Sequence, residues 1–511
     1  MMSGTGNEEY RYRRFMRQKV SDIAHCIGFN KKSVRKTYHA DAHEDGRLET
    51  LRAHEYSQLK DTIYLDHAGT TLYARSLMEN FANDMVSNLY GNPHSDSKPS
   101  AKAGQAVDDV RAQALKFFRA DPEHWDLVFT ANATAAIKLV VECFRDKAVS
   151  TDMRFWYGYH ADAHTSIVGG RELSASSLCF RSDADVEDWL RDEESDKPAA
   201  DCLGVFAYPG QSNMTGRRLP LDWCGRLRKR PSGAKVYTLL DAAALASTNQ
   251  IDLSEPSSAP DFVALSFYKI FGFPNLGALL VRKDSAAVLK ARKYFGGGTI
   301  DAVTTGGLDW HASKVTNLHD RLEDGTLPFH AIFALGHAIS VHKRLYGPDP
   351  MLCISMHTSR LIAILFQGLI ALRHANGQPV VTVYNRQDVV YGDPKVQGAT
   401  VAFNIHEANG ALIGYKKVET AANAKKIFLR SGSLCNPGGI VTYLGWSDEG
   451  IRAGYAAGHR CSKPIEVVNG RQTGVVRASL GAMSSASDVV ALLKFLHDSY
   501  LQASKLSLPE E

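Results

Sequence analysis

Short runs of apolar residues alternate with helical patterns along most of the chain from Thr62 onward. Residues 127–130 form one such run, and residues 134–143 repeat apolar positions at the spacing of a helix. Further runs with the length and composition of buried strands cover residues 202–208, 236–240, 262–266 and 277–281. Apolar strands separated by helices predict a mostly parallel sheet with helices on both faces.

The pattern changes near residue 330, where a long helix precedes a second group of strands. Helices are expected at 332–345 and 486–501, and strands at 380–384, 400–403 and 475–479. This order predicts a second, smaller α+β domain. We therefore expect three parts: an N-terminal extension that joins the small domain (1–61), a large domain (62–330) and a small C-terminal domain (331–511). Within the extension, residues 12–27 have a rough helical spacing.

The composition is that of a soluble globular protein, with 44% hydrophobic and 22% charged residues among 511. The 59 basic and 55 acidic residues leave a net charge of +4, which is too balanced to favour a nucleic-acid-binding surface. No apolar run approaches about 18 residues and the N-terminus lacks an apolar signal segment, so we expect no membrane association. The eight cysteines contain no C-x-x-C pair, which predicts free thiols, no metal site and a reducing, cytoplasmic location.

Polar residues recur at the ends of the predicted strands. Four strands end beside such residues: Thr130, Tyr208, Asp241 and Ser266. In parallel sheets, ligands bind beyond the carboxyl ends of the strands. This repeated placement is the first indication of a functional site.

Asp241 and Lys269 are residue types suited to pyridoxal 5′-phosphate (PLP). Asp241 ends one strand and Lys269 follows another. A lysine amine bonds covalently to the PLP aldehyde, and an acid keeps the pyridine nitrogen protonated so that the ring accepts electrons from a substrate carbanion. A lysine taken alone is most often a surface residue. The segment 266–277 is too apolar for a surface loop, however, and this favours the PLP interpretation.

The phosphate of PLP needs N–H donors at the start of a helix. The segment 130–134 lies between a predicted strand and a predicted helix, and its amides, Ala133 included, could bind phosphate together with the Thr134 hydroxyl. Ser266 and Tyr268 would add further hydroxyls. The alternative is that Thr134 serves only as a helix N-cap, which is common at any helix start.

Five motifs occur in the order found in a known family. They are YLDHAGTT (64–71), GNPHS (91–95), HTS (164–166), QSNMTG (211–216) and RSGSLCNPG (430–438). With them the chain resembles the class V aminotransferase group of PLP enzymes. It resembles more closely the N-terminal, cysteine-desulfurase-like part of eukaryotic molybdenum cofactor sulfurases. The resemblance covers roughly residues 60–500, and it implies PLP-dependent transferase fold type I, the aspartate-aminotransferase-like fold, in a homodimer with active sites near the subunit interface.

The resemblance also implies roles for individual residues. Lys269 is the lysine that bonds PLP, and Asp241 is the partner of the pyridine nitrogen. His164 stacks on the cofactor ring; without the resemblance it would read as a loop or capping histidine. Asn213 contacts the cofactor or the substrate near the ring oxygen.

Two further roles follow from the resemblance. Arg477 grips the substrate carboxylate, for which a planar two-pronged donor is suited, although a strand arginine is ordinarily only a surface residue. Thr299, after three consecutive glycines, reaches the phosphate of the neighbouring subunit. Taken alone, those glycines indicate only a flexible turn.

Cys435 is the residue on which the predicted activity depends. In desulfurases, a cysteine of the enzyme attacks the sulfur of the bound substrate and becomes a persulfide. Such a thiol must be exposed and partly deprotonated, and a loop lets it move between cofactor and acceptor. Gly432, Pro437, Gly438 and Gly439 surround Cys435 with flexible and loop-forming residues. An inert loop thiol or a simple binding contact remains the alternative.

The sequence departs from the sulfurase pattern at several points. Ser433 stands where many sulfurases have a second cysteine, and Gly439-Ile440 stands where many have Ala-Cys. Ala244 and Tyr268 replace the Gln and His of simpler desulfurases, as they do in the sulfurase subgroup. Full sulfurases continue into a C-terminal domain that holds the molybdenum cofactor, and we expect no such domain after residue 501.

The resemblance thus predicts a PLP-dependent cysteine desulfurase that moves sulfur from L-cysteine to Cys435 and releases alanine. The sulfur would then pass to the molybdenum cofactor or to an acceptor protein, and Lys269 would also move the proton at the substrate Cα. One alternative is another PLP reaction on a small amino acid, by a C–S lyase, epimerase or aminotransferase, in which Cys435 is dispensable. A non-catalytic scaffold is a third possibility, against which the Lys269–Asp241 pair argues.

Overall fold

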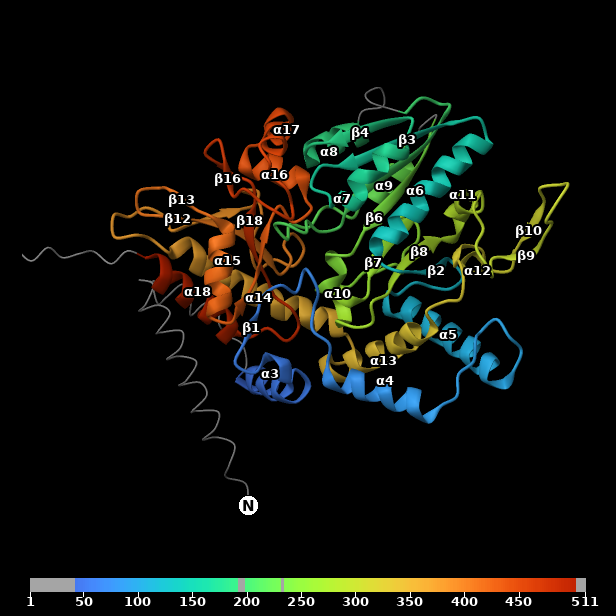
Figure 1. Cartoon of the computed structure of the whole chain (residues 1–511), viewed down its shortest axis with the longest axis horizontal. Helices are drawn as coiled ribbons and strands as arrows, with labels where there is room; N and C mark the ends of the chain where they lie inside the picture. Colours follow the sequence, from blue (N-terminus) through green and yellow to red (C-terminus); the bar gives the residue numbers. More distant parts are fainter. Residues whose placement is uncertain (1–41, 192–197, 231–233, 502–511) are drawn as a thin grey trace, which may run out of the picture.

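The computed structural model describes residues 42–191, 198–230 and 234–501, and two main sheets organise it (Figure 1). The helix expected over residues 12–27 lies outside the described residues. The larger sheet stands among the green and teal elements of Figure 1, and the smaller one among the orange and red elements.

The larger sheet has seven strands in the order β2-β8-β7-β6-β5-β3-β4. Their bounds are β2 (Trp125–Thr130), β3 (Arg154–His160), β4 (Ser176–Phe180), β5 (Cys202–Pro209), β6 (Lys235–Asp241), β7 (Phe262–Ser266) and β8 (Gly277–Arg282). β8 runs antiparallel to its neighbours β2 and β7, whereas the other four pairs are parallel. The prediction of a mostly parallel sheet is confirmed.

Two strands of this sheet are not predicted from apolar runs. β3 begins with Arg154, ends with His160, and has Gly158 among its aromatic residues. β4 lies at the edge of the sheet, where Ser176 and Ser177 are exposed. An edge strand buries fewer side chains, and its sequence therefore lacks the continuous apolar run of a central strand.

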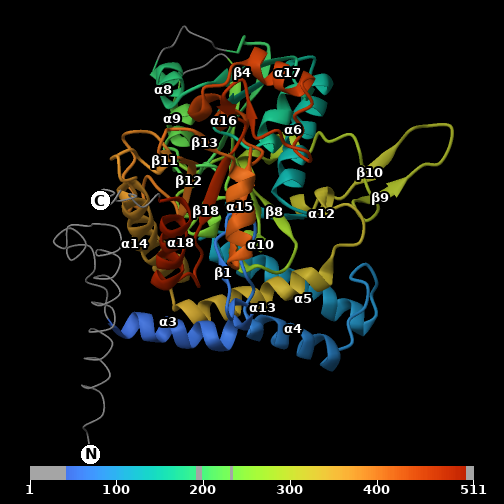
Figure 2. The same ribbon diagram turned by 60° about the vertical axis from the view of Figure 1, so that its left-hand side comes forward.

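Helices cover both faces of the larger sheet. Leu127 and Phe129 of β2 pack in one apolar cluster with residues of α5 (Lys98–Phe117) and α13 (Phe329–Tyr346). Val128 belongs to a second cluster, which it shares with residues of α6 (Ala133–Ser150). Because strand side chains alternate between faces, α6 covers one face while α5 and α13 cover the other (Figure 1 and Figure 2).

The smaller sheet is antiparallel and has the order β11-β12-β18-β15, with β13 paired to β12. Its strands are β11 (Val381–Tyr384), β12 (Thr400–His406), β13 (Leu412–Ile413), β15 (Arg430–Gly432) and β18 (Val475–Ser479). The helices α14 (Pro350–Ala371), α15 (Tyr415–Ala424) and α18 (Ala486–Tyr500) contribute to its apolar core.

Helix α14 is the one helix in the described ranges that is long and apolar enough to span a membrane by length and composition. Of its most apolar window, 56% is buried inside the protein. Leu361, Leu365 and Leu369 pack in the core beneath the smaller sheet. A buried core helix satisfies the same length and composition test, and the packing of α14 is of that kind.

The segment after α3 (Ala42–Glu55) lies against the smaller sheet. β1 (Ile63–Tyr64) pairs in parallel with β14 (Ile427–Phe428), and Asp66 forms a parallel bridge with Ser479 of β18. Arg52 of α3 donates to Asp488 of α18 at 2.6 Å. An early part of the chain therefore lies beside the last strand of the smaller sheet.

Shorter elements complete the described fold. They are α4 (Arg75–Ser87), α7 (Thr165–Val168), α8 (Asp183–Arg191), α9 (Trp223–Lys229), α10 (Tyr268–Phe271), α11 (Ala286–Leu289), β9 (Ile300–Val303), β10 (His311–Ser313), α12 (Leu318–Leu322), α16 (Pro437–Leu444), α17 (Asp448–Ala456), β16 (Val467–Val468) and β17 (Arg471–Gln472). The β9–β10 hairpin stands away from the body of the protein in both views (Figure 1 and Figure 2).

Candidate active site

The candidate site begins at the edge of the larger sheet where the parallel strands end. Asp241 is the last residue of β6 and pairs with Ala264 of β7. Lys269 lies in α10, the short helix that follows β7. The register of β6 and β7 therefore brings Asp241 and Lys269 to the same edge of the sheet. The Asp241 carboxylate is buried and accepts a hydrogen bond from the Ala243 amide at 2.9 Å.

Lys269 is partly buried among four charged side chains: Asp241, Arg477, Arg430 and Asp66. Burial lowers the pKa of the Lys269 amine, because the charged form loses the solvation of water. Asp241 is the strongest charge that opposes this shift, while the two arginines lower the pKa further. A lowered pKa increases the share of the neutral amine, which is the form that attacks an aldehyde.

His164 lies against the same groups. It caps the start of α7, and its Nδ1 accepts a hydrogen bond from the Ser166 amide at 3.1 Å. Burial lowers the pKa of His164, and the charges of Asp241 and Lys269 act on it in opposite directions. A neutral ring with its Nδ1 engaged carries its proton on Nε2. Such a ring can lie against an aromatic cofactor.

The start of α6 provides N–H and hydroxyl groups close to these residues. Its N-cap is Asn132, whose side chain accepts from the Ala135 amide at 3.0 Å, and not Thr134. The Thr134 hydroxyl instead contacts the Ser166 hydroxyl at 2.7 Å. The Ala133 amide donates to Ser266 Oγ at 2.9 Å. The start of α6, the end of β7 and the loop that carries His164 thus form one polar cradle. Such a group of N–H and hydroxyl donors at a helix start is of the kind that binds phosphate.

Two neighbouring residues complete the description of this cradle. A Cβ on Gly277 would lie 2.4 Å from the Asn132 backbone, so glycine lets β8 begin directly against the loop. The carbonyl of Tyr268 accepts hydrogen bonds from the amides of Gly272 and Thr71, at 3.0 and 3.4 Å. A phosphate contact of the Tyr268 hydroxyl stays a prediction.

Arg477 of β18 reaches the site from the smaller sheet. Its Nη2 donates to Asp66 Oδ1 at 2.6 Å, and its Nη1 donates to the Asn213 carbonyl at 2.8 Å. The side chain is 3% exposed, and its Nε has no hydrogen-bond partner within residues 42–191, 198–230 and 234–501. Burial lowers the pKa of Arg477, and Asp66 opposes the shift. A buried guanidinium whose Nε–H is unused is suited to an additional anionic ligand.

Asp66 and Arg430 are site residues to which the sequence assigned no role. Arg430 of β15 pairs directly with Arg477 of β18, and its Nη1 lies 3.9 Å from Asp66 Oδ2. Its side chain is 50% exposed. Both residues lie inside the motifs at 64–71 and 430–438, but their contact depends on the pairing of β15 with β18, which no local pattern reveals.

Cys435 lies on the loop between β15 and α16. The thiol is free and partly buried. The Cys435 carbonyl accepts from the Thr165 amide at 2.9 Å, directly beside His164. Leu434 and Cys435 both have left-handed backbones, with φ of 56° and 53°. Such a conformation costs about 1 kcal/mol or more for each non-glycine residue, so the surrounding contacts must hold this loop.

Other thiols in the described chain have a different environment. Burial raises the pKa of the Cys143 and Cys224 thiols to about 12, so both remain protonated. Cys353 and Cys461 are exposed but stand apart from the motifs. Partial exposure beside His164 therefore distinguishes Cys435 from these four.

Asn213 connects the thiol loop to Arg477. Its Nδ2 donates to the Leu434 carbonyl at 2.7 Å, and its Oδ1 accepts from Asn436 Nδ2 at 3.1 Å. Its own carbonyl is the acceptor for Arg477. The Asn213 side chain is thus engaged with the loop, and its predicted contact with cofactor or substrate stays a prediction.

Thr299 is not brought into this cluster. Its hydroxyl donates to the Gly296 carbonyl at 2.8 Å, and its carbonyl accepts from the Lys314 amide at 3.1 Å. It directly precedes β9, and the β9–β10 hairpin lies beside α12 and away from α10 in Figure 1. Its role toward a neighbouring subunit stays a prediction.

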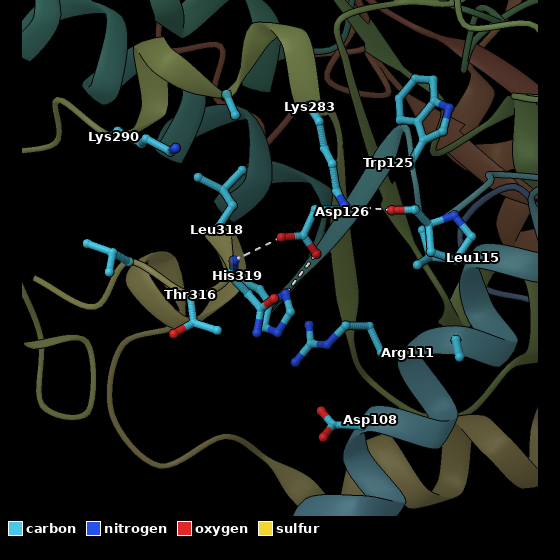
Figure 3. Close-up of a pocket in the computed structure, with 15 residues that line it drawn as sticks. Asp108, Arg111, Leu115, Trp125, Asp126, Lys283, Lys290, Thr316, Leu318 and His319 are labelled. Atoms are coloured by element: carbon cyan, nitrogen blue, oxygen red, sulfur yellow. Dashed lines mark hydrogen bonds and ion pairs between the residues drawn. The ribbon is translucent and has the colours of Figure 1, made fainter.

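A pocket of about 480 Å³ lies at the opposite end of β2 and β8 from the cluster. Figure 3 shows Asp126 and His319 in contact in this pocket, with Asp126 Oδ1 at 2.7 Å from His319 Nδ1. Lys283 donates to the Pro122 carbonyl at 2.6 Å, and Arg111 forms an ion pair with Glu323 at 2.7 Å. It contains none of the predicted site residues.

Known proteins resemble this chain in sequence. A family model for aminotransferase class-V matches residues 63–455. Molybdenum cofactor sulfurases from Aspergillus niger and Aspergillus fumigatus are 52% and 53% identical over 458 residues, which is 89% of this chain. These matches cover 55% and 54% of the two relatives, so the chain spans about half of their length.

Solved structures resemble it in fold. A cysteine desulfurase from Thermococcus onnurineus NA1 has a TM-score of 0.66 at 19% identity, covering 88% of this chain and 97% of that one. The cysteine desulfurase CsdA from Escherichia coli has a TM-score of 0.63 at 18% identity, covering 88% and 98%. The cystine C-S lyase C-DES has a TM-score of 0.60 at 15% identity, covering 87% and 99%.

These likenesses confirm the predicted fold type I. The family model covers both the strand ends that carry Asp241 and Lys269 and the loop that carries Cys435. The ordered motifs, the shared fold and this match lead to one conclusion: the chain belongs to the aminotransferase class-V family.

Proposed function

We propose that this chain is a PLP-dependent cysteine desulfurase of the molybdenum cofactor sulfurase type. It takes sulfur from L-cysteine onto Cys435 as a persulfide and releases alanine. The observation that carries the proposal is the attachment of the Cys435 loop to the strand ends of the larger sheet, through the bond from the Thr165 amide to the Cys435 carbonyl at 2.9 Å. Thr165 is the residue after His164, so this bond holds the loop that carries the thiol beside the cluster that contains Lys269 and Asp241.

The donor set of the cluster fits PLP. The Lys269 amine suits the aldehyde, and the buried Asp241 carboxylate suits the pyridine nitrogen. The His164 ring suits the face of the cofactor. The first turn of α6, with the hydroxyls of Thr134 and Ser266, suits the phosphate. When bound, PLP withdraws electrons from the substrate α-carbon.

The side chains then have distinct tasks. Lys269, whose pKa burial lowers, moves the proton at Cα. Arg477 binds the substrate carboxylate through donors that include its unused Nε–H, while Asp66 and the Asn213 carbonyl fix its orientation. The Cys435 thiolate forms an S–S bond to the substrate sulfur as the C–S bond breaks. The electron pair of that bond stays with the substrate carbon, which is protonated to the methyl group of alanine.

The test is incubation of the purified full chain with PLP and L-cysteine, followed by mass spectrometry of the products. We expect alanine in solution and a mass increase of one sulfur atom on the peptide that contains Cys435. A Cys435→Ala protein keeps the visible absorbance of bound PLP and forms no persulfide. Absence of both alanine and persulfide in the wild type contradicts the proposal.

A second PLP reaction is favoured by one specific observation. The fold is shared with a C-S lyase as well as with desulfurases. A C–S lyase, epimerase or aminotransferase acting on a small amino acid uses Lys269 and Asp241 but has no need of Cys435. Unchanged turnover in a Cys435→Ser protein therefore selects this alternative.

We propose that the sulfur acceptor is the molybdenum cofactor or a protein that carries it. The relatives at 52% and 53% identity are named molybdenum cofactor sulfurases, and this chain spans about half of their length. The test is transfer of radiolabelled sulfur from the loaded chain to a purified molybdenum-cofactor protein. Label that remains on Cys435 after mixing contradicts this choice of acceptor.

We also propose a homodimer. Three exposed apolar side chains lie on the projecting β9–β10 hairpin: Val303, Leu308 and Trp310. Clustered exposed apolar residues mark interaction sites. A second copy covering this hairpin also brings Thr299 toward the other subunit. Light scattering that reports a monomer at micromolar concentration contradicts the proposal.

Two further expectations remain proposals. The seven cysteines in the described ranges are free, which supports a reducing, cytoplasmic compartment. The separate apolar core under the smaller sheet supports the division into large and small domains near residue 330. Fractionation of cells and limited proteolysis test these two proposals.

A further inference from the structure

A buried polar contact joins the Cys435 loop to the loop after β3. Asn436, which directly follows Cys435, is fully buried, and its Nδ2 donates to Asp162 Oδ1 at 2.8 Å. The Asn436 Oδ1 accepts from the Gly439 amide at 2.8 Å, so the same side chain caps α16. One carboxamide therefore holds both the thiol loop and the helix after it.

Asp162 is itself fixed by the larger sheet. Its Oδ1 also accepts from the Ser212 hydroxyl at 2.6 Å, and its Oδ2 lies 3.5 Å from Arg217 Nη2. Its amide donates to His160 Nδ1 at 3.0 Å. The carboxylate is buried, so its position relative to the strand ends is set by these partners and not by solvent.

The contact acts where the backbone is strained. Leu434 and Cys435 are both in the left-handed region, immediately before Asn436. On one side the Leu434 carbonyl is held by Asn213, and on the other the Asp162–Asn436 bond fixes the next side chain. A left-handed backbone relaxes when its tethers are lost, and the direction of the Cys435 side chain changes with it.

We infer that Asp162, acting through Asn436, is a positioning residue that sets where the Cys435 thiol lies relative to the substrate sulfur. The inference rests on the proposed desulfurase function. Neither residue touches the reacting atoms. Their bond orients the thiol, and Lys269, Asp241 and the cradle at α6 are left unchanged by its loss.

The experiment exchanges donor and acceptor. Asn436→Asp keeps the oxygen that caps α16 but places a second carboxylate against Asp162. Asp162→Asn removes the charged acceptor. The double variant Asp162→Asn/Asn436→Asp restores a donor–acceptor pair in the opposite sense. We expect each single variant to form alanine from L-cysteine about 10- to 100-fold more slowly, and the double variant to recover at least part of the loss.

Two measurements separate positioning from folding. β-Chloroalanine loses chloride after deprotonation at Cα and needs no thiol, so its conversion to pyruvate stays within about twofold of wild type in the single variants. Alkylation of Cys435 by iodoacetamide, followed by peptide mass spectrometry without substrate, becomes about threefold faster or more as the loop is released. Ser212→Ala removes another donor to Asp162, and it slows alanine formation and speeds alkylation of Cys435 by less than the single variants do.

A matched control is Asn376→Asp, at an exposed asparagine of the smaller-sheet region, which we expect to match wild type in both reactions. Single variants that release alanine at the wild-type rate overturn the inference. Loss of both reactions together with a lowered melting temperature also overturns it, because the pair then serves folding alone.

The inference and the proposed function fail separately. A wild type that forms neither alanine nor persulfide contradicts the function, while the alkylation rates still test the loop. Faster alkylation in the single variants, reversed in the double variant, supports the inference. Equal rates in all four proteins overturn it.

Discussion

The strand ends of the larger sheet and the Cys435 loop present their reactive groups in different ways. Asp241 ends β6 and Lys269 lies just after β7, so the parallel register of these two strands brings both to one edge of the sheet. Cys435 lies on a left-handed backbone that side chains and amides from elsewhere in the chain hold in place. The amine is therefore fixed by the fold, whereas the thiol is fixed by a small set of tertiary hydrogen bonds.

This difference suits the two tasks. An amine that bonds a cofactor and moves one proton benefits from a rigid, buried position with a shifted pKa. A thiol that collects sulfur and later delivers it must leave its position without unfolding the protein. Substitutions should therefore separate the two regions, with those near Lys269 affecting every reaction and those near Cys435 affecting only sulfur transfer.

Lys269→Ala is expected to have the largest effect. Without the amine, both alanine formation from L-cysteine and pyruvate formation from β-chloroalanine fall by about 10³-fold or more, because the proton at Cα has no acceptor. Lys283→Ala, at an exposed lysine just after β8, is the control and remains within about twofold of wild type. Steady-state assays of both substrates measure the effect. A Lys269→Ala protein that keeps roughly a tenth of wild-type activity would assign the amine to another residue.

Cys435→Ser is expected to separate the two reactions. Alanine formation falls by about 10²-fold and the persulfide disappears, while conversion of β-chloroalanine stays within about twofold of wild type. The control is Cys353→Ser, an exposed cysteine of α14. Product analysis by mass spectrometry checks both outcomes. Equal loss of both reactions would mean that the thiol loop also shapes the binding of PLP.

The sequence predicts the first region much better than the second. Asp241 and Lys269 follow apolar runs whose periodicity reveals the strands, so their position at the sheet edge follows from local pattern. The contacts of Arg477 with Asp66 and of Asn436 with Asp162 join residues separated by 411 and 274 positions. These contacts depend on how the smaller sheet lies against the larger one, and no spacing along the chain contains that information.

The same limit applies to the elements that the sequence missed. The edge strand β4 lacks a continuous apolar run, and β3 includes charged and glycine positions. From the sequence, Thr134 is either a phosphate ligand or the N-cap of α6. The structure shows that the N-cap is Asn132. A local motif can identify a helix start, but the choice between two neighbouring polar residues is made by backbone geometry.

Gly438→Ala tests the close contact between the Cys435 loop and the larger-sheet region. A Cβ at this position would lie 2.0 Å from the Ala161 carbonyl oxygen, so the loop must move away from the residues after β3. We expect alanine formation from L-cysteine to fall by about 10-fold, with a loss of about 1–3 kcal/mol in the free energy of unfolding. Conversion of β-chloroalanine should change by less than about twofold.

Its control is Gly104→Ala on α5, where nothing lies within 4 Å of the added Cβ. Alanine there is expected to raise the free energy of unfolding by about 0.5–1 kcal/mol, since glycine weakens a helix interior. Urea unfolding and the two assays distinguish these proteins. A Gly438→Ala protein that forms alanine from L-cysteine at the wild-type rate would show that the loop does not pack against Ala161 during the reaction.

His342 of α13 allows a test of the rigid side alone, with the smallest effect on turnover. Burial lowers the pKa of His342 from 6.5 to about 3, and its ring packs 5.1 Å from that of Phe271 in α10, the helix that carries Lys269. The unfolded chain therefore binds this proton at a higher pH than the folded protein does. The contribution of this group to the free energy of unfolding is complete above about pH 6.5. It falls as the pH decreases toward 3, by up to about 1.4 kcal/mol per pH unit. His67, whose pKa burial also lowers to about 3, adds a slope of the same sign.

We expect His342→Leu to remove one of these two slopes between about pH 6 and pH 4, as measured by urea unfolding at each pH. Turnover of the variant at neutral pH should stay within about twofold of wild type. An unchanged slope in His342→Leu would mean that the pKa of His342 is not lowered in the folded protein. The ring would then not be buried as a neutral group against α10, and the rigid position of that helix would have to come from other contacts.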